Sequence, residues 1–219
     1  GETFSEAEIR AALRVSVMDG SVIPVTMGSN VLCQGIYTLL DDILKYFPSP
    51  ENRKCAGVDM KTNEIFEANY DFSKAKSAVV WKTIVDPFIG KYSMIKVNSG
   101  VLKPEDVIYN VDKDVEMKAG KLYVLQGNKP IEVPELHAGD IGAIAKLTAA
   151  RTGDSLSTKQ HVIKYGKPDM SVPYTYKRYN AVNKGDIDKI SQSLQKIMHE
   201  DMTIKVVNDS ENRQTLLYG

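Results

Sequence analysis

Residues 86–91 read DPFIGK, and they lie between two strand-like runs, Ala78–Val85 and Tyr92–Val97. Proline presets φ for a turn and glycine permits a positive φ, so Pro87 and Gly90 predict a tight connection between two strands. Three similar turns follow along the chain: GVLKPED at 100–106, AGDI at 138–141 and TGDSL at 152–156. Further strand-like runs alternate with them, at Asp106–Val111, Lys121–Leu125 and Ile141–Leu147. Many short strands separated by regular turns indicate a β-barrel or sandwich.

The region before residue 50 has a different pattern. Ser5 and Glu8 predict a capping box at the start of a helix over residues 5–18. Ser21–Met27 predicts a buried strand, and a turn at Gly28-Ser29-Asn30 leads to an amphipathic helix from Ile36 to Phe47. Strand, turn and helix in this order predict the last unit of an α/β domain.

Residues 172–219 show a third pattern. Val172–Tyr179 alternates like a strand, and a helix is expected from Asp186 onward, with its apolar face on one side. Thr203–Val207 and Gln214–Tyr218 then predict two strands joined by a turn. The order β-α-β-β is the first part of a ferredoxin-like split βαβ unit.

We therefore expect a mainly β fold with α+β flanks, divided into four segments. These are the end of an α/β domain at 1–50, a polar linker at 51–74, a complete β-barrel at 75–168 and a truncated β-α-β-β unit at 169–219. The linker follows the Pro48-Ser49-Pro50 signal. The chain opens on Gly1 without a methionine and stops at Gly219, directly after a strand-like run, so we expect a fragment of a longer protein.

Composition excludes several classes of function. Lys plus Arg and Asp plus Glu each number 28, a balance that argues against a free-standing nucleic-acid binder. Residues 76–170 carry 14 basic and 11 acidic groups, so the middle is the better place for a polyanionic partner. Cys33 and Cys55 predict neither a disulfide framework nor a zinc site. With no signal peptide and no apolar run of membrane-spanning length, we expect a cytoplasmic protein without a membrane partner.

The sequence predicts no catalytic residues and no metal ligands. There is no GxxxxGK[ST] loop that could hold phosphates. His137, His161 and His199 are widely spaced and lack neighbours of metal-ligand type. Each histidine is therefore expected to be structural or exposed.

In their order and spacing, the turn motifs resemble the second domain of translational GTPases, and of elongation factor G in particular. That domain reads DPFxGK, a strand ending in YSG, GxLxxGD, AGDI and TGDTL. The corresponding runs here are DPFIGK, VNSG, GVLKPED, AGDI and TGDSL. PVTMGSN and GIYTLLDDILKYFPSP resemble the end of the family's GTP-binding domain, and residues 186–219 resemble the start of its third domain. The resemblance covers essentially the whole chain, although Asn30 replaces the usual alanine and suggests a divergent paralogue.

The resemblance implies that the intact protein is a GTPase that uses GTP and Mg to move tRNA and mRNA on the ribosome. Gly28, Ser29 and Asn30 would be the remnant of its guanine site. The barrel would rest on small-subunit ribosomal RNA, with Lys91 and Lys121 as candidate contacts. This chain would be monomeric and inactive by itself, with no cofactor, because the phosphate-binding motifs are absent. The family's turn residues would be structural: Asp86, Pro87, Phe88, Gly90, Gly100, Gly139, Asp140, Gly153 and Asp154.

Two alternatives remain open at the level of sequence. A ribosomal protection GTPase of the tetracycline-resistance type shares the same domains. A β-barrel adaptor that binds no nucleotide is the other alternative, from a different class of function.

Overall fold

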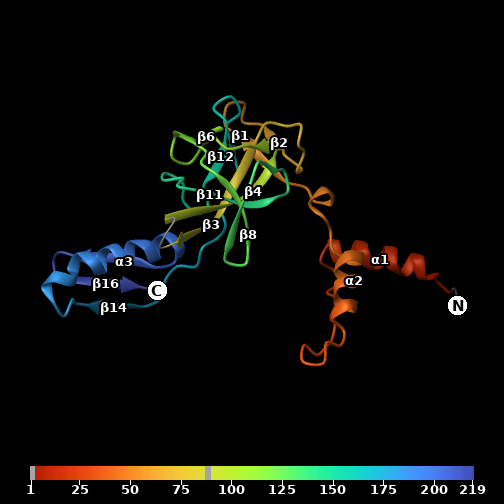
Figure 1. The fold of residues 1–219 in the computed structure, drawn as a ribbon, viewed down its shortest axis with the longest axis horizontal. Helices are drawn as coiled ribbons and strands as arrows, with labels where there is room; N and C mark the ends of the chain where they lie inside the picture. Colours follow the sequence, from red (N-terminus) through yellow and green to blue (C-terminus); the bar gives the residue numbers. More distant parts are fainter. Residues whose placement is uncertain (1–2, 87–89) are drawn as a thin grey trace. The chain divides into compact units, whose positions relative to one another are not determined.

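The computed structural model describes residues 3–86 and 90–219 and divides into two compact units, Gly1–Arg53 and Lys54–Gly219. Figure 1 shows helices in the first unit and mostly strands in the second. Each unit is described separately below.

The first unit consists of two helices, α1 (Glu6–Met18) and α2 (Ile36–Tyr46), which contact each other. The predicted capping box is present: Glu8 N–H donates to Ser5 Oγ at 3.3 Å, and Ser5 N–H donates to the Glu8 carboxylate at 2.8 Å. One contact between the two helices is a hydrogen bond from the Arg14 guanidinium to Lys45 O, at 3.3 Å.

The prediction of a strand at residues 21–27 is wrong, because the structure has no strand there. Among the described residues of the unit, this segment forms no regular structure and pairs with no strand. A strand buried in a parallel sheet needs neighbours on both edges to satisfy its backbone groups. Ile23, Val25 and Met27 are therefore all more than 80% exposed.

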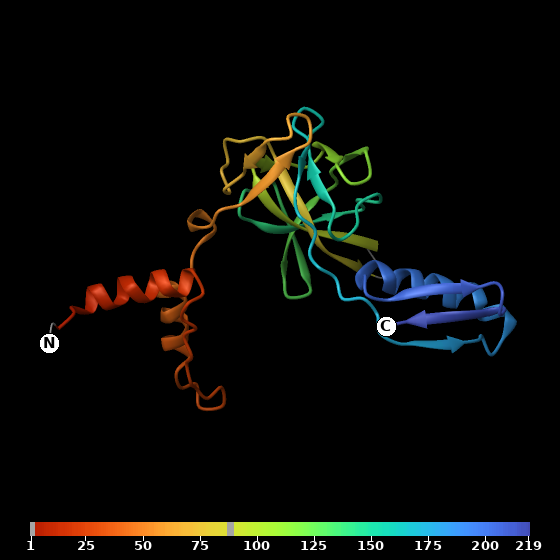
Figure 2. The same ribbon diagram turned by 180° about the vertical axis from the view of Figure 1, so that it is seen from behind.

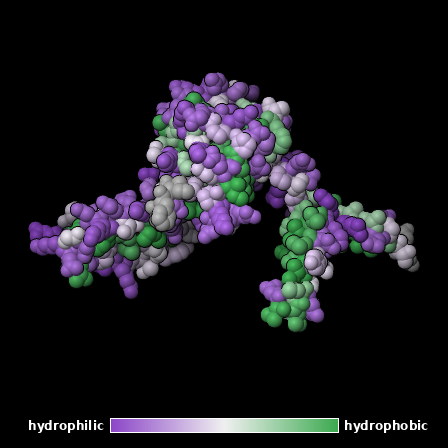
Figure 3. Space-filling model, viewed as in Figure 1, coloured by the Kyte–Doolittle hydropathy of each residue, from purple (hydrophilic) through white to green (hydrophobic). Residues whose placement is uncertain are grey.

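Hydrophobic side chains remain uncovered throughout this unit, and Figure 3 shows them along α2. No residue described in either helix is buried. The exposed set on α2 comprises Ile36, Tyr37, Leu39, Leu40, Ile43 and Leu44. An apolar surface of this extent on a small unit is typical of a face that packs against another part of a protein.

The second unit is built around an eight-stranded antiparallel sheet. Its strand order is β7-β6-β12-β3-β4-β11-β8-β9. The strands are β3 (Ser77–Asp86), β4 (Gly90–Ser99), β6 (Val107–Asn110), β7 (Val115–Lys118), β8 (Leu122–Gln126), β9 (Lys129–Val133), β11 (Ile141–Ala145) and β12 (Ser155–Ser157). Two short strands, β5 (Val101–Leu102) and β10 (Leu136–His137), pair with each other. The five predicted strands of this region are all present.

One buried cluster joins strands from all around this sheet, which gives the β-barrel-like fold expected from the sequence. The cluster takes Val80 from β3, Ile95 from β4, Leu122 from β8 and Ile144 from β11, each fully buried. Members from β5, β6, β10 and β12 complete it. Burying a Val, Leu or Ile side chain contributes about 1.5–3 kcal/mol, so this core stabilises the unit strongly.

The turn at 86–91 lies only partly in the described residues. Asp86 pairs with Gly90 at the ends of β3 and β4, and Gly90 has φ +91°. The expected contributions of Pro87 and Phe88 lie outside the described residues.

The segment 51–74, expected as a linker, contains regular structure. After a 3₁₀ turn at Pro50–Asn52, β1 (Ala56–Asp59) and β2 (Ile65–Glu67) form a sheet with β13 (Ile163–Lys164) in the order β13-β1-β2. Ala68, Ile163 and Tyr165 form a separate buried cluster beside this sheet. Residues 54–74 are therefore part of the second unit and do not form a free linker.

The C-terminal part has the predicted β-α-β-β order: β14 (Tyr176–Tyr179), α3 (Ile187–Glu200), β15 (Lys205–Asp209) and β16 (Gln214–Tyr218). A 3₁₀ turn, Lys184–Asp186, precedes α3. The sheet order β14-β16-β15, all antiparallel, is that of a split βαβ unit. Figure 1 shows α3 along one face of this sheet.

Among the described residues, no helix is both long and apolar enough to cross a membrane.

Candidate functional site

Three turns of the barrel are built with the same device. Within each turn, an aspartate carboxylate accepts a hydrogen bond from the backbone N–H three residues earlier: Lys103 to Asp106 (2.7 Å), His137 to Asp140 (2.8 Å) and Arg151 to Asp154 (2.9 Å). A charged acceptor strengthens such a bond relative to a neutral one. The loops are therefore held in defined positions at the ends of the strands.

Glycine is required at several of these turns. Gly100, Gly139 and Gly153 have φ of +72°, +95° and +90°. At Gly100 the space is also closed, because a Cβ atom would lie 2.6 Å from Lys76 Cα. The turn residues of the sequence motifs thus hold the backbone in conformations that other residues rarely adopt.

A buried polar network continues from Asp154, which is 2% exposed. Its carboxylate also accepts from Asn110 Nδ2 at 2.8 Å. Beside it, the buried Asp112 carboxylate accepts from Ser155 N–H at 2.8 Å and lies 3.1 Å from Lys167 Nζ and 3.6 Å from Lys164 Nζ. Burial raises the pKa of Asp112, but the Ser155 N–H and the two lysines outweigh this effect and hold the pKa below its usual value.

Lys91, a predicted RNA contact, is half-buried near the start of β4. Its ammonium donates to the carbonyls of Thr148 (3.4 Å) and Ala150, and its own carbonyl accepts from Lys146 N–H at 2.9 Å. Burial lowers the pKa of Lys91, and the nearby Arg151 adds to this effect. Through these hydrogen bonds, Lys91 therefore holds the loop of residues 146–151 in place.

Lys121, the other predicted contact, lies on the surface directly before β8. Its Nζ atom is 2.8 Å from Glu132 Oε2 on the neighbouring β9, and both side chains are more than half exposed. The hydrogen bond from Lys121 to Glu132 raises the pKa of this lysine. The β8–β9 hairpin that follows extends away from the body of the barrel (Figure 2). Lys121 is accessible, but a phosphate would have to displace Glu132.

Arg151 and His199, to which the sequence assigned no site, line the same pocket. Arg151 lies on the loop that Lys91 anchors, and His199 lies near the end of α3, which packs against β3. Glu200 on the same helix accepts a hydrogen bond from Val85 N–H of β3, at 2.6 Å. The only sequence signal was an arginine directly before the TGDSL turn, and nothing in the sequence linked it to a histidine 48 positions later.

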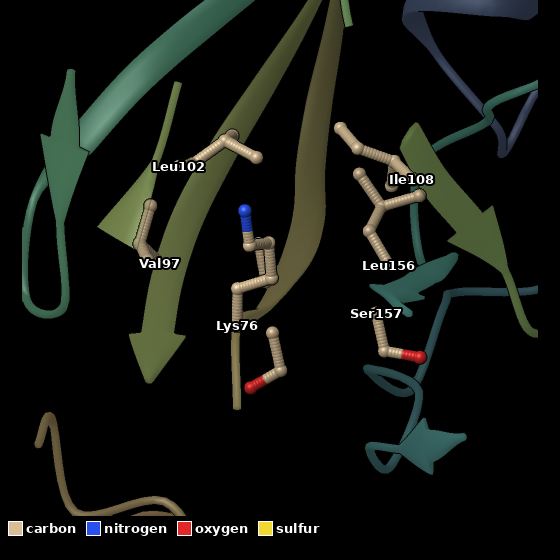
Figure 4. Close-up of a pocket in the computed structure, with 8 residues that line it drawn as sticks. Lys76, Val97, Leu102, Ile108, Leu156 and Ser157 are labelled. Atoms are coloured by element: carbon tan, nitrogen blue, oxygen red, sulfur yellow. The ribbon is translucent and has the colours of Figure 1, made fainter. Parts of the chain in front are cut away.

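The opening of the barrel core, shown in Figure 4, is not a ligand site. It lies between Leu102, Ile108 and Leu156, and the Lys76 side chain extends through it. The Lys76 ammonium is 2.6 Å from Asp106 Oδ2. The remaining free volume is about 10 Å³. This is at most the space of one water molecule, so the opening is a gap in the packing.

The predicted guanine remnant forms a tight turn. Ser29 N–H and Gln34 O are 3.0 Å apart, Gln34 N–H donates back to Ser29 O at 3.1 Å, and Asn30 O accepts from Cys33 N–H. A Cβ atom on Gly28 would lie 2.7 Å from Gln34 O, so the turn needs glycine there. The backbone donor of Ser29 is already used inside the turn.

The described residues contain no group of three or more His, Cys, Asp or Glu side chains that could hold a metal ion. His137 lies between Glu135 (3.0 Å) and Asp140 (3.6 Å), against the ring of Phe72.

Comparisons with known proteins match the second unit to two consecutive domains. The family model described as Elongation factor G domain 2 matches residues 75–159, and the one described as Elongation Factor G, domain III, matches residues 170–219. The first match covers the barrel and the second covers the β-α-β-β unit.

The chain also resembles a crystal structure from Thermus thermophilus, with a TM-score of 0.71 and 25% sequence identity. The match covers 100% of this chain and 31% of that chain, so the chain spans about a third of the length of this solved structure. Because two successive domains of one family match in the family's order over more than half of its residues, the chain belongs to the elongation factor G family.

Proposed function

We propose that this chain is the docking segment of an elongation factor G-like GTPase that promotes movement of tRNA and mRNA on the ribosome. The observation that supports this most directly is the consecutive match to domain 2 and domain III of that family. In this proposal the barrel binds small-subunit ribosomal RNA, and the β-α-β-β unit transmits the position of the barrel to the remainder of the protein.

Contacts to the RNA backbone suit the surface of this barrel. Phosphate contacts need cationic side chains on a rigid support, and they position a protein without reading base sequence. The aspartate turns supply the rigidity, and Lys121 supplies an accessible charge. Lys91 contributes by holding the 146–151 loop in place, because its ammonium is already bonded to Thr148 O and Ala150 O.

The GTP site is proposed for the intact protein only. The turn at Gly28-Ser29-Asn30 would complete a guanine site, and the exposed apolar face of α2 would pack against the remainder of a GTP-binding domain. GTP and Mg would be held by that remainder. This chain alone is expected to bind no GTP measurably by calorimetry.

The test uses the intact protein and two opposed variants of one ion pair. Lys121→Gln removes the proposed phosphate contact, whereas Glu132→Gln removes its competitor and leaves Lys121 free. Binding to ribosomes should weaken several-fold in Lys121→Gln and strengthen in Glu132→Gln, and both effects should shrink at high salt. Co-sedimentation at two salt concentrations measures this.

Equal binding by both variants would remove Lys121 from the docking surface, and no ribosome binding by the unmodified protein would refute the proposal. Ribosome-stimulated GTP hydrolysis without tRNA movement, but with release of tetracycline from the ribosome, would identify a protection factor instead. Ribosome binding without GTP binding would identify an adaptor.

A further inference from the structure

A pocket lined by both polar and apolar side chains lies where the barrel meets α3. Arg151 and Thr152 line it from the loop before β12, Gln195, Met198 and His199 line it from α3, and Met202 lines it from the segment after α3. Its volume is about 260 Å³. This is several times the roughly 30 Å³ that one water molecule occupies in the liquid, so the pocket has room for a small polar group.

The two ionisable residues that line this pocket are both basic. Arg151 and His199 line it, and Lys91 lies beneath the same loop. Burial lowers the pKa of His199, and the positive charges of Lys91 and Arg151 lower it further. Arg151 also lowers the pKa of Lys91. These three groups therefore interact electrostatically, and they repel one another.

The carboxylates of this region are directed to other partners. Asp154 accepts from Arg151 N–H and Asn110 Nδ2, Glu200 accepts from Val85 N–H, and Asp201 accepts from Thr203 N–H and Oγ1. Within residues 3–86 and 90–219, no carboxylate lies within 4 Å of the Arg151 guanidinium or the His199 ring. Four of the residues that line the pocket, Arg151, Thr152, Gln195 and His199, have side-chain hydrogen-bond donors, and none of the six is acidic.

We infer that this pocket binds one phosphate group, with the Arg151 guanidinium as its principal ligand and the His199 ring as a second donor. A guanidinium presents two parallel N–H groups that match two phosphate oxygens. The Gln195 amide can donate a third bond, and Thr152 Oγ1 is 3.1 Å from Thr83 Oγ1, with which it can share a hydrogen bond. The group could come from free inorganic phosphate or from an RNA backbone, since both present the same oxygens.

Such a ligand would join two parts of the second unit. Arg151 belongs to a barrel loop and His199 to α3, whereas the hydrogen bond from Val85 N–H to Glu200 is another direct contact between β3 and α3. A bound anion would replace repulsion between Arg151 and His199 by attraction of both to one charge. The inference does not rest on the proposed function, because the pocket and its charges belong to this chain whatever its partner is.

The experiment follows the imidazole signals of His199 by NMR in the 219-residue chain. The pH titration is recorded in sodium chloride and in sodium phosphate at equal ionic strength. Phosphate should raise the pKa of His199 by about 1 unit, because a nearby anion favours the protonated ring. His161 is exposed and lies outside the pocket, so its imidazole signals serve as the internal control.

Variants of Arg151 test whether its guanidinium binds the phosphate. Arg151→Gln should abolish the effect of phosphate on His199, and Arg151→Lys, which keeps the charge, should retain part of it. Thermal unfolding verifies that both variants fold. Lys129→Gln removes a charge from the outlying β9 and should leave the effect intact.

A third titration with a short single-stranded RNA oligonucleotide distinguishes the two sources. A raised pKa with both ligands supports a site open to an RNA backbone, and a raised pKa with inorganic phosphate only supports a site for the free ion. An unchanged His199 midpoint with both ligands overturns the inference. A full effect of phosphate in Arg151→Gln removes Arg151 from the site and overturns it as well.

Discussion

Loss of the side-chain charge should affect different properties at Lys91 and at Lys121, although both are basic residues of the same barrel. Lys91→Met keeps most of the aliphatic stem and removes the ammonium that donates to Thr148 O and Ala150 O. Lys121→Met breaks only an exposed ion pair with Glu132. The first variant should lose stability, and the second should lose ribosome affinity.

The magnitudes follow from the two environments. A hydrogen bond to a charged group contributes about 1.5–3 kcal/mol when well formed. Because Lys91 is half exposed and one of its bonds is long, we expect Lys91→Met to lower the free energy of unfolding by about 1–2 kcal/mol. For a unit the size of Lys54–Gly219 this lowers Tm by roughly 2–8 °C. An exposed ion pair such as that of Lys121 is worth about 0–1 kcal/mol.

Urea and thermal unfolding of the 219-residue chain measure the stabilities, and co-sedimentation of the intact protein measures ribosome binding. Both variants are compared with the unmodified protein under the same salt conditions. If Lys91→Met is as stable as Lys121→Met and binds ribosomes more weakly, the anchoring role is refuted and Lys91 is a direct contact after all.

Three further predictions test the supports of the barrel. Asp112→Ala should cost about 1–3 kcal/mol and Asp112→Asn less, because the amide oxygen can still accept from Ser155 N–H. Since the pKa of Asp112 is lowered by folding, its contribution exists above the ordinary carboxylate pKa and is lost as pH falls through the folded value; urea midpoints measured down to acid pH should fall less steeply in Asp112→Asn. Burial raises the pKa of Tyr165 to about 12, so its phenol should titrate late in ultraviolet absorbance, and Tyr165→Phe should remove that late change; an identical late part of the titration in Tyr165→Phe would contradict this. Gly100→Ala should destabilise by more than about 1 kcal/mol and Gly127→Ala by less, because both have positive φ but only Gly100 lacks space for a Cβ atom; equal unfolding midpoints would contradict this.

The elements with strong local patterns were predictable from sequence. The Ser5–Glu8 capping box, α3 and the five long apolar runs of the barrel all carry a period or a cap within a few residues. Some of the missed strands are short and depend on distant partners. For example, β1 pairs with β13 more than a hundred residues later, and no local pattern records such a pairing. The strand at 21–27 failed for the opposite reason, because its local pattern is correct but no partner strand is present among the described residues of its unit.

The candidate site was less predictable than the fold. A basic residue at a barrel turn predicts a charge on the surface. Whether its side-chain ammonium contacts solvent or a backbone carbonyl depends on the path of a neighbouring loop. Lys91 faces the carbonyls of a loop nearly 60 residues later, whereas Lys121 faces its neighbour in a hairpin. The proximity of Arg151 and His199 requires α3 to pack on the barrel, a tertiary contact that no motif encodes.

The packing of α3 on the barrel also explains how a few basic side chains can act together on one phosphate group. With a Debye length of about 8 Å at physiological salt, exposed lysines scattered over a barrel act independently on a phosphate. Lys91 has its charge partly buried under a loop, and the loop carries Arg151 toward α3. A buried charge is screened less by salt, so Lys91 strengthens the potential at Arg151 without touching the ligand. Docking through such a pair should therefore depend on the loop being folded. Lower temperature should therefore restore only the part of ribosome binding that Lys91→Met loses through a loosened loop, and none of the binding that Arg151→Gln loses.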